Sequence, residues 1–589
     1  MTDRRGYVHA LALLVPMLAL YLWLAPPFIV DGDNAEFSTL SAEGGMAHPP
    51  GYPAYVMYLR ALSWLPGSAA HSAALATALL GVAAAMVLWA ACRAWGARPM
   101  AASIAVAVFA AGPIVMRLHT AAEVFAMNHL VVALVLWLAA TNGPLRGARR
   151  AFVLGLVGGI GMANQHTCVL VAPLGILGAV RGVRESDRMA LVTVGLSLAG
   201  LALGLAAYGY AFVAPDSLVS WGQPDSPAKL FAHFTRADYG GVGAFSPVEG
   251  KIDPVANLAA LVHSLGRSWL WVLALVGIAM LGVRSVRATD GETRWAWRFL
   301  AASFLFAGPI LVARFNVEPV GIGLNICQRF HLMSLLLLVI PVALGIDAIF
   351  DRARTKVATP MFDRLGVQVA LAAAIFVGTA GLSLGYVRAT HSPAVEQGVL
   401  NFLRSMPENA VVLTTADDMY FGSTYAQLTL GVRRDVVIVS WPMTVLPWYR
   451  ERLAKRGVAI DPYANKGTEQ PSIVVANQVH ALKRPLFCEI SLGNVLQAFP
   501  TYPYGMVFRV LPAGTPRPTL DEIVEMNHDV FSKFVLDYPF PDEEMEYAAE
   551  MHVRYARTWD IIARAFLEAG RRSDARAASD LVKQLAPTK

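Results

Sequence analysis

Three carboxylates within six residues form the most chemically informative group of the 589-residue sequence. They are Asp31, Asp33 and Glu36, and a segment rich in proline, 48–53 (HPPGYP), follows them closely. Asp33 and Glu36 are three residues apart, so on a helix they would share one face. A carboxylate held in a rigid setting can act as a general base toward a hydroxyl group. Asp33 and Glu36 are therefore candidates for a catalytic pair, and His48 is a candidate substrate-binding residue beside them.

Two other interpretations of these carboxylates stay open. Asp-x-x-Glu is typical of a capping box, with Asp33 as the N-cap and Glu36 in the first turn, and for the tetrapeptide by itself capping is the more common role. The pattern Asp31-Gly32-Asp33 could bind a divalent cation through oxygens. So short a pattern does not favour metal dependence, and we expect no metal or other cofactor. The prolines and the glycine of 48–53 favour a site, because they hold the backbone in shape beside the carboxylates.

Further polar residues lie at the ends or breaks of apolar stretches. Glu123 comes at the start of a helix, where it could take part in the chemistry or only be favoured by the helix dipole. His166 lies in a polar break, where it could be functional or satisfy freed backbone groups. The long loop 211–267 adds aromatic and basic residues that could pack on a sugar or anchor at the membrane surface: Trp221, Arg236 and Tyr239.

The composition places these residues in a membrane protein. The chain is 56% hydrophobic and 15% charged, with a mean hydropathy of +0.49, whereas soluble chains average about 25% charged residues. A bilayer needs about 20 apolar residues per spanning helix. Two further apolar halves, between 152 and 180, are split by the polar residues 164–166, which predicts a broken or re-entrant pair and about eleven segments. The expected full spans are 8–29, 69–91, 99–116, 121–140, 188–210, 268–283, 299–313, 331–349 and 366–386.

The basic residues predict the orientation. Arginine and lysine gather in alternate loops, which indicates a cytoplasmic N-terminus and an extracytoplasmic chain after residue 386. The net charge of +6 therefore reflects topology, and nucleic acid is not an expected partner. No Asn begins an N-x-[ST] sequon, which argues against a eukaryotic secretory protein. We expect a multi-pass protein of a bacterial inner membrane, with the lipid bilayer as its surroundings.

The chain after residue 386 has the composition of a soluble domain. Short runs at 410–415, 435–440, 472–475 and 487–490 predict strands, and helices are expected near 419–430 and 446–456. The alternation predicts a small α/β unit with a partly parallel sheet. Segments 547–569 and 573–585 predict a helical hairpin similar to one tetratricopeptide unit. We expect three domains: a transmembrane domain 1–386, an α/β domain 387–515 and a helical region 516–589.

The first-loop motifs resemble those of a known family. D-[SN]-[GA]-E-F followed by H-P-P-G-x-P is similar to the signature of a polytopic membrane family that includes a protein O-mannosyltransferase of the GT-C glycosyltransferase class. The likeness covers most of residues 10–455, although Asn34-Ala35 stands where Ser-Gly is commoner in the family. The other matching segments are 122–128, 163–167, 220–222, 328–332, 417–418, 434–436 and 448–449.

The resemblance implies a GT-C fold and a transferase that uses a polyprenyl- or dolichyl-phosphate sugar. It implies that Asp33 acts as the base or orients the acceptor, with Glu36 as its helper. The acceptor would be a protein or glycan outside the cytoplasm. The departing lipid phosphate needs cationic stabilisation, for which Arg329 is the candidate, unless that arginine only extends to the membrane surface. His331, in the same matching segment, is a further substrate-binding candidate.

Two other functional classes stay open. A transporter also has broken helices around a central polar site, but the sequence shows no internal repeat and its acidic residues gather in an outer loop. A receptor or scaffold that binds partners through its tail would leave the first-loop motifs unexplained. The absence of a P-loop motif argues against a nucleotide-driven pump.

Overall fold

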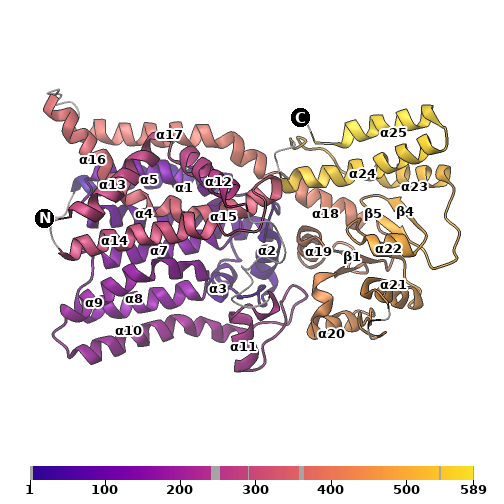
Figure 1. Cartoon of the computed structure of the whole chain (residues 1–589), viewed down its shortest axis with the longest axis horizontal. Coiled ribbons are helices and arrows are strands. Elements are labelled where there is room, and N and C mark those ends of the chain that lie inside the picture. Colours follow the sequence, from indigo (N-terminus) through magenta and orange to yellow (C-terminus); the bar gives the residue numbers. More distant parts are fainter. Residues whose placement is uncertain are drawn as a thin grey trace. The chain divides into compact units, whose positions relative to one another are not determined.

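The chain forms two compact units, each described here by itself (Figure 1). The computed structural model describes residues 4–239, 253–288, 291–356, 364–465, 467, 469–542 and 546–587. The first unit contains Met1–Pro27, Met46–Ala214 and Gln223–Arg388, and the second contains Phe28–Gly45, Pro215–Gly222 and Ala389–Lys589. Two short segments from the earlier part of the chain thus fold with the tail. The domain limits expected at 386 and 515 stay predictions.

The first unit is helical in all the elements that the structure describes. Its α-helices are α1 (Arg4–Leu24), α3 (Pro53–Ala61), α4 (Ala69–Ala94), α5 (Pro99–Ala110), α6 (Pro113–Thr120), α7 (Phe125–Ala139), α8 (Gly147–Met162), α9 (Ala172–Arg184), α10 (Ala190–Leu205), α11 (Pro227–Phe234), α12 (Pro254–Ser268), α13 (Val272–Arg287), α14 (Gly291–Leu305), α15 (Gly321–Leu337), α16 (Val339–Lys356) and α17 (Leu365–Thr390). The shorter turns are η1 (His166–Val171), η2 (Ala206–Phe212), η3 (Ala237–Tyr239) and the π-helical η5 (Phe306–Ile310).

Every expected span falls on helices, but fewer helices are long enough to cross a bilayer than the sequence predicts. Within the described residues, five helices have the necessary length and apolar composition, or up to eight if each of three bent pairs is one span. The bent pairs are α5–α6, α12–α13 and α15–α16, with bends of 70°, 107° and 44°. The count is below eleven because other helices are short, such as α7 with 15 residues.

The polar break at 164–166 is present. Helix α8 ends at Met162, and the chain resumes as η1 at His166 and continues into α9. The second half of the pair is long enough to cross a bilayer, because His166–Arg184 forms a 19-residue apolar helical segment. The helix is longer than the apolar run because its last turn includes Arg181 and Arg184.

Glycines allow α8 and α10 to pack at close range. Gly155 and Gly159 of α8 face α10, and a Cβ added at either would collide with the carbonyl oxygen of Ser197 or Leu201. Gly200 of α10 meets the Phe152 carbonyl oxygen in the same way. The four-residue spacing of these glycines is the small-xxx-small pattern of helices that pack closely in membranes.

The second unit is built around a five-stranded mixed sheet with the order β2-β1-β3-β5-β4. Strand β1 (Val411–Thr414) is parallel to β2 (Val437–Ser440) and to β3 (Leu486–Cys488). Strand β5 (Val507–Val510) is antiparallel to β3 and to β4 (Thr501–Tyr504). Every residue of β1 and β2 is buried, as expected for parallel strands covered on both faces. The prediction of a partly parallel sheet is confirmed.

The second unit also contains helices that precede, separate and follow the strands in the sequence. They are α2 (Asn34–Glu43), α18 (Ala394–Ser405), α19 (Asp417–Thr429), η7 (Pro442–Val445), α20 (Pro447–Lys455), α21 (Pro471–Ala481), α22 (Gly493–Ala498), α23 (Leu520–Ser532), α24 (Glu546–Glu568) and α25 (Arg572–Leu585). Helices α24 and α25 lie side by side, joined at Gly570, whose φ is +75° (Figure 1). The predicted helical hairpin is confirmed.

Two local predictions for the tail were wrong or incomplete. Residues 472–475 form a helix rather than a strand, because Pro471 occupies the first turn and the buried residues Ser472, Val475 and Val479 follow a helical spacing. The hairpin β4–β5 was not predicted. Pro503 interrupts its pattern, and proline is tolerated there because β4 is the edge strand of the sheet.

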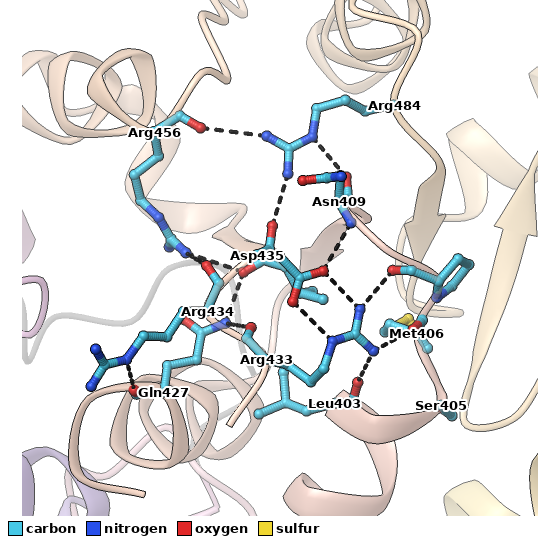
Figure 2. Close-up of polar contacts among 12 residues, drawn as sticks. Leu403, Ser405, Met406, Asn409, Gln427, Arg433, Arg434, Asp435, Arg456 and Arg484 are labelled. Carbon is cyan, nitrogen blue, oxygen red and sulfur yellow. Dashed lines mark hydrogen bonds and ion pairs between the residues drawn. The ribbon is translucent and has the colours of Figure 1, made fainter. Parts of the chain in front are cut away.

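Arginines join the turns that precede the three parallel strands (Figure 2). Arg433 donates two hydrogen bonds to the carboxylate of Asp435, at 2.9 and 2.8 Å. Arg484 donates to the carbonyl oxygens of Asn409 and Asp435, at 2.7 and 3.1 Å. The Arg433 guanidinium, followed by the Asn409 N–H, holds the pKa of Asp435 well below its usual range. Arg433 also donates to three carbonyl oxygens at the end of α18 and just after it: Leu403, Met406 and Pro407.

Candidate functional site

Asp33 and Glu36 lie at the start of α2, in the second unit. Asp33 is the residue before the helix and is half-buried, whereas Glu36 in the first turn is fully buried. A carboxylate oxygen of Asp33 lies within 4.8 Å of one from Glu36. Two carboxylates at this separation can position one acceptor hydroxyl or share one divalent cation through their oxygens.

The structure does not support the capping-box interpretation of Asp33. Although the whole first turn of α2 is described, its backbone N–H groups donate no hydrogen bond to the Asp33 side chain. Asn34 instead holds the approach to the helix, because its Oδ1 accepts the Val30 N–H at 3.1 Å. The Asp33 side chain therefore does not cap α2.

Helix α2 is held by elements of the tail. It packs on α19, whose Tyr420 is buried. Before α2, the Ile29 N–H donates to Glu396 of α18 at 3.0 Å. Rigid neighbours on both sides thus fix where the two carboxylates lie.

Trp221 belongs to the same unit. Its side chain is buried, with its ring centroid 6.0 Å from that of Trp448. Arg452 lies over the Trp448 ring and donates to Asp216 at 2.7 Å and to the Ser220 carbonyl oxygen. These contacts hold the segment 215–222 against α20. Trp221 thus packs on another tryptophan of its own unit.

Glu123 and Arg329 meet in the first unit. Glu123 lies in the turn between α6 and α7, and its side chain is 2% exposed. Arg329 of α15 is 11% exposed, and its Nη1 lies 3.7 Å from a carboxylate oxygen of Glu123. The Arg329 side chain is thus mostly buried beside a carboxylate.

More cationic groups surround the same stretch of α15. Arg117 of α6 is buried and donates to the hydroxyl of Tyr386 at 2.9 Å. That hydroxyl donates to Gln328 Oε1 at 3.2 Å, and Arg267 of α12 lies 4.9 Å from the centroid of the Tyr386 ring. Arg117 and Arg267 thus both contact Tyr386. The Tyr386 hydroxyl also contacts Gln328, which precedes Arg329 in the sequence.

The other candidates of the first unit are spread over separate contacts. His48 is half-buried and lies 3.3 Å from the Tyr52 hydroxyl. His166 lies 3.4 Å from the Tyr208 hydroxyl and packs on Phe234. His331 is fully buried, and its Nδ1 lies 2.8 Å from Ser264 Oγ. These contacts position the rings but do not assign them a role.

The loop 211–267 is described in part. Arg236 is half-buried and adopts a φ of +60° just after α11. The side chain of Tyr239 lies outside the described residues. His233 of α11 contacts the Ala47 carbonyl oxygen at 3.1 Å, next to His48, although the sequence did not single it out. Its ring also lies where a Cβ on Gly51 would be, and Gly51 has a φ of +96°.

Sequence reasoning missed three residues of this group, Gln328, Arg267 and Tyr386. Gln328 lies within the matching segment 328–332, so its position gave a signal that was not used. Arg267 and Tyr386 gave none, because each lies in an ordinary helical sequence and only the packing of α12, α15 and α17 brings it to this place.

The chain was compared with known families and proteins. The family model of the N-terminal domain of the protein O-mannosyl-transferase TMEM260 matches residues 33–187, which begin at Asp33. Protein O-mannosyl-transferase TMEM260 of Mus musculus is 24% identical over 464 residues, which are 76% of this chain and 64% of that protein. The Dictyostelium discoideum protein of the same name is 21% identical over 512 residues, which are 79% of this chain and 62% of that protein.

These matches confirm the family resemblance that the first loop predicted. The chain is O-mannosyl-transferase-like in sequence. It spans slightly less than two thirds of the length of both relatives, 64% and 62%. Half of the predicted site residues lie within the matched segment 33–187. They are Asp33, Glu36, His48, Glu123 and His166.

The fold is that of the GT-C class. The crystal structure of ArnT from Cupriavidus metallidurans in the apo state superposes with a TM-score of 0.51, covering 87% of this chain and 99% of that one at 10% identity. The likeness and the apolar helices together indicate a membrane protein. The predicted fold class, a helical polytopic protein with a small α/β tail, is confirmed.

Proposed function

We propose that the chain is a membrane glycosyltransferase that moves a sugar from a polyprenyl-phosphate-linked donor to an acceptor hydroxyl. Mannose is the first sugar to test, because the relatives in mouse and Dictyostelium are named O-mannosyl-transferases. The acceptor would be a protein or a glycan outside the cytoplasm.

The observation that carries this proposal is the state of Asp33. Its carboxylate lies next to that of Glu36 at the start of a fixed helix, yet it does not cap that helix. Asp is among the best capping residues, so a conformation that does not use it for capping favours another role. In a sequence matched to an O-mannosyl-transferase family from residue 33 onward, that role is a general base.

The proposed transfer forms one bond and breaks another at C1 of the sugar. The acceptor oxygen attacks C1 of the sugar, and the bond between C1 and the phosphate oxygen breaks with its electron pair going to the phosphate. Asp33 accepts the proton of the hydroxyl group. The buried Glu36 would orient the acceptor hydroxyl toward Asp33.

The first unit contains groups suited to the other half of the step. A leaving phosphate gains negative charge, which preorganised cations stabilise. Arg117 and Arg267 contact Tyr386, and Arg329 pairs with Glu123, so this unit supplies three positive charges to the proposed group. We assign the donor phosphate to this group.

We further propose the orientation and location that the basic residues predict. The N-terminus would be cytoplasmic, and the second unit would face the outside of a bacterial inner membrane. A reporter that is active only outside the cytoplasm, fused after residue 589, should give signal. Signal from the same reporter fused within the loop 284–298, instead of at the tail, would reverse the orientation.

Replacement of Asp33 tests the proposed base. Asp33→Asn keeps the shape and would cap a helix about as well, but it removes the basic carboxylate. We expect transfer to fall on the order of 10²-fold or more, with an unchanged melting temperature. The assay is incorporation of labelled sugar from polyprenyl-phosphate mannose into protein and glycan of membranes that lack the native enzyme.

The matched control is Glu43→Gln, which removes an exposed carboxylate from the end of the same helix. It should transfer at the wild-type rate. Wild-type transfer by Asp33→Asn would remove Asp33 from the mechanism, and equal losses in the two variants would mean that α2 tolerates no change of charge.

A further inference from the structure

The second unit contains a cavity of about 200 Å³ that the proposed transfer step does not use. It lies where β1 and β3 end and is closed on one side by α24. Residues just after the two strands line it, among them Thr415, Glu489 and Ser491, and α24 contributes Glu550, Arg554 and Arg557. Among the residues described, neither Asp33 nor Arg329 lines this cavity.

The place of the cavity in the sheet is one where α/β proteins commonly bind ligands. From β1 the chain passes to β2 on one side, and β3 then joins β1 on the other side. The chain connections thus run in opposite directions across the sheet on either side of the junction between β1 and β3. A crevice opens at such a switch point, outside the carboxyl ends of parallel strands. Thr415 and Glu489 come directly after these two ends.

The polar groups of the cavity are held in fixed positions. The Thr415 N–H donates to Glu489 Oε2 at 2.9 Å, and the hydroxyls of Thr415 and Ser491 are 2.7 Å apart. On α24, Arg554 pairs with Asp418 at 3.2 Å and with Glu550 at 3.5 Å. Burial alone would lower the pKa of Arg554, but Asp418, Glu489 and Glu550 raise it, so this arginine stays charged.

The balance of charge indicates the kind of ligand. Glu489 and Glu550 would repel an anion, and Arg554 and Arg557 would repel a cation. A neutral ligand therefore binds with the smallest electrostatic penalty. Carboxylates accept hydrogen bonds and guanidinium groups donate them, which suits a ring that carries several hydroxyl groups. Phe508 and Met506 add an apolar surface for its C–H face.

We propose that this cavity binds one monosaccharide unit of a neutral glycan. Its volume lies below the roughly 300–1,000 Å³ of pockets for drug-sized ligands, which fits a single sugar ring with the rest of the glycan outside. The site goes beyond the proposed transfer, because it would recognise a glycan without reacting with it.

Binding of a simple mannoside tests the site directly. Methyl α-mannopyranoside is titrated into the purified full-length chain, in a detergent without a sugar head group and with no donor present, and is followed by saturation-transfer NMR. We expect saturable binding by the wild type. Arg557→Ala, which removes donors from the wall, and Ile561→Trp, which fills the space, should each weaken it about tenfold or more.

The matched control is Arg564→Ala on the same helix, at an arginine whose side chain is 73% exposed. It should bind like the wild type. The proposal is overturned if the folded wild type binds no mannoside, if Ile561→Trp binds it unchanged, or if inorganic phosphate binds in its place. Since no donor is present, each of these results is independent of whether the chain transfers sugar.

Discussion

Two charged regions of the molecule place an arginine beside a carboxylate in different ways. Before the parallel strands, Arg433 makes two hydrogen bonds to Asp435 and donates to three backbone carbonyls (Figure 2). In the helical unit, Arg329 lies 3.7 Å from Glu123, which is beyond hydrogen-bonding distance. Arg433 thus joins segments of the chain, whereas Arg329 has a loose ion pair that a bound phosphate could tighten. The geometry of the pair, rather than its presence, separates a structural arginine from a candidate functional one.

The largest effect should come from Arg329. Arg329→Ala removes a cation that would stabilise the leaving phosphate, so we expect transfer to fall on the order of 10²-fold or more. Arg329→Lys should keep part of the activity, because lysine supplies the charge without the fork of donors. Steady-state rates at varied polyprenyl-phosphate mannose measure the effect, and acceptor affinity should change little.

Arg314→Ala, at an exposed arginine of the same unit, is the control and should keep the wild-type kinetics. If Arg329→Ala keeps the wild-type kinetics toward the donor, the phosphate binds elsewhere. Arg329 would then be no more functional than Arg433. Arg117 would then be the next arginine to replace, because it already binds Tyr386 in the same group.

Arg433 should show the opposite pattern, a loss of stability without a specific loss of transfer. Arg433→Ala removes a charged donor from Asp435 and from three backbone carbonyl oxygens, which we expect to cost about 2–4 kcal/mol. For a unit of this size the apparent melting temperature should fall by roughly 4–16 °C, followed by tryptophan fluorescence in detergent. Arg564→Ala removes only an exposed i,i+4 pair and should change stability by less than about 0.5 kcal/mol.

The smallest effect concerns pH. Because Arg433 lowers the pKa of Asp435, the stabilising contribution of this carboxylate is complete above its unfolded pKa of about 3.9 and is lost as the pH falls below it. The melting temperatures of the wild type and of Asp435→Asn should therefore differ at pH 7 and begin to converge only below about pH 4, as the pH falls toward the lowered folded pKa. The difference should be about 1 kcal/mol, since Asp435 is partly exposed. A gap that stays constant with pH would show that the carboxylate charge is not what Arg433 recognises.

Patterns that depend on neighbouring residues could be predicted from the sequence. The polar run at 164–166 indicated the break between α8 and η1, and β-branched runs indicated β1 and β2. The same reasoning failed at α21, where valines favoured a strand but Pro471 began a helix. It also missed β4, because proline weakens a strand prediction although an edge strand accepts it.

The site could be predicted only in part, because its environment comes from distant segments. The motif indicated Asp33 and Glu36, but neither the packing of α2 on α19 nor the missing cap follows from local sequence. Arg329 was a candidate by its motif, whereas its partner Glu123 lies about two hundred residues earlier. Long-range packing brings such pairs together, and one sequence without homologues contains no signal for it.

The packing of α2 on α19 has a consequence for how the protein is made. Phe37 and Leu40 of α2 are buried, and the helix packs on α19, which the ribosome synthesises much later. Between Glu43 and Asp417 the nascent chain grows by roughly 370 residues, which at about 5–20 residues per second takes on the order of 20–75 s. During that time α2 is a natural client for a chaperone, and a tail expressed alone from residue 389 would lack the helix that covers α19.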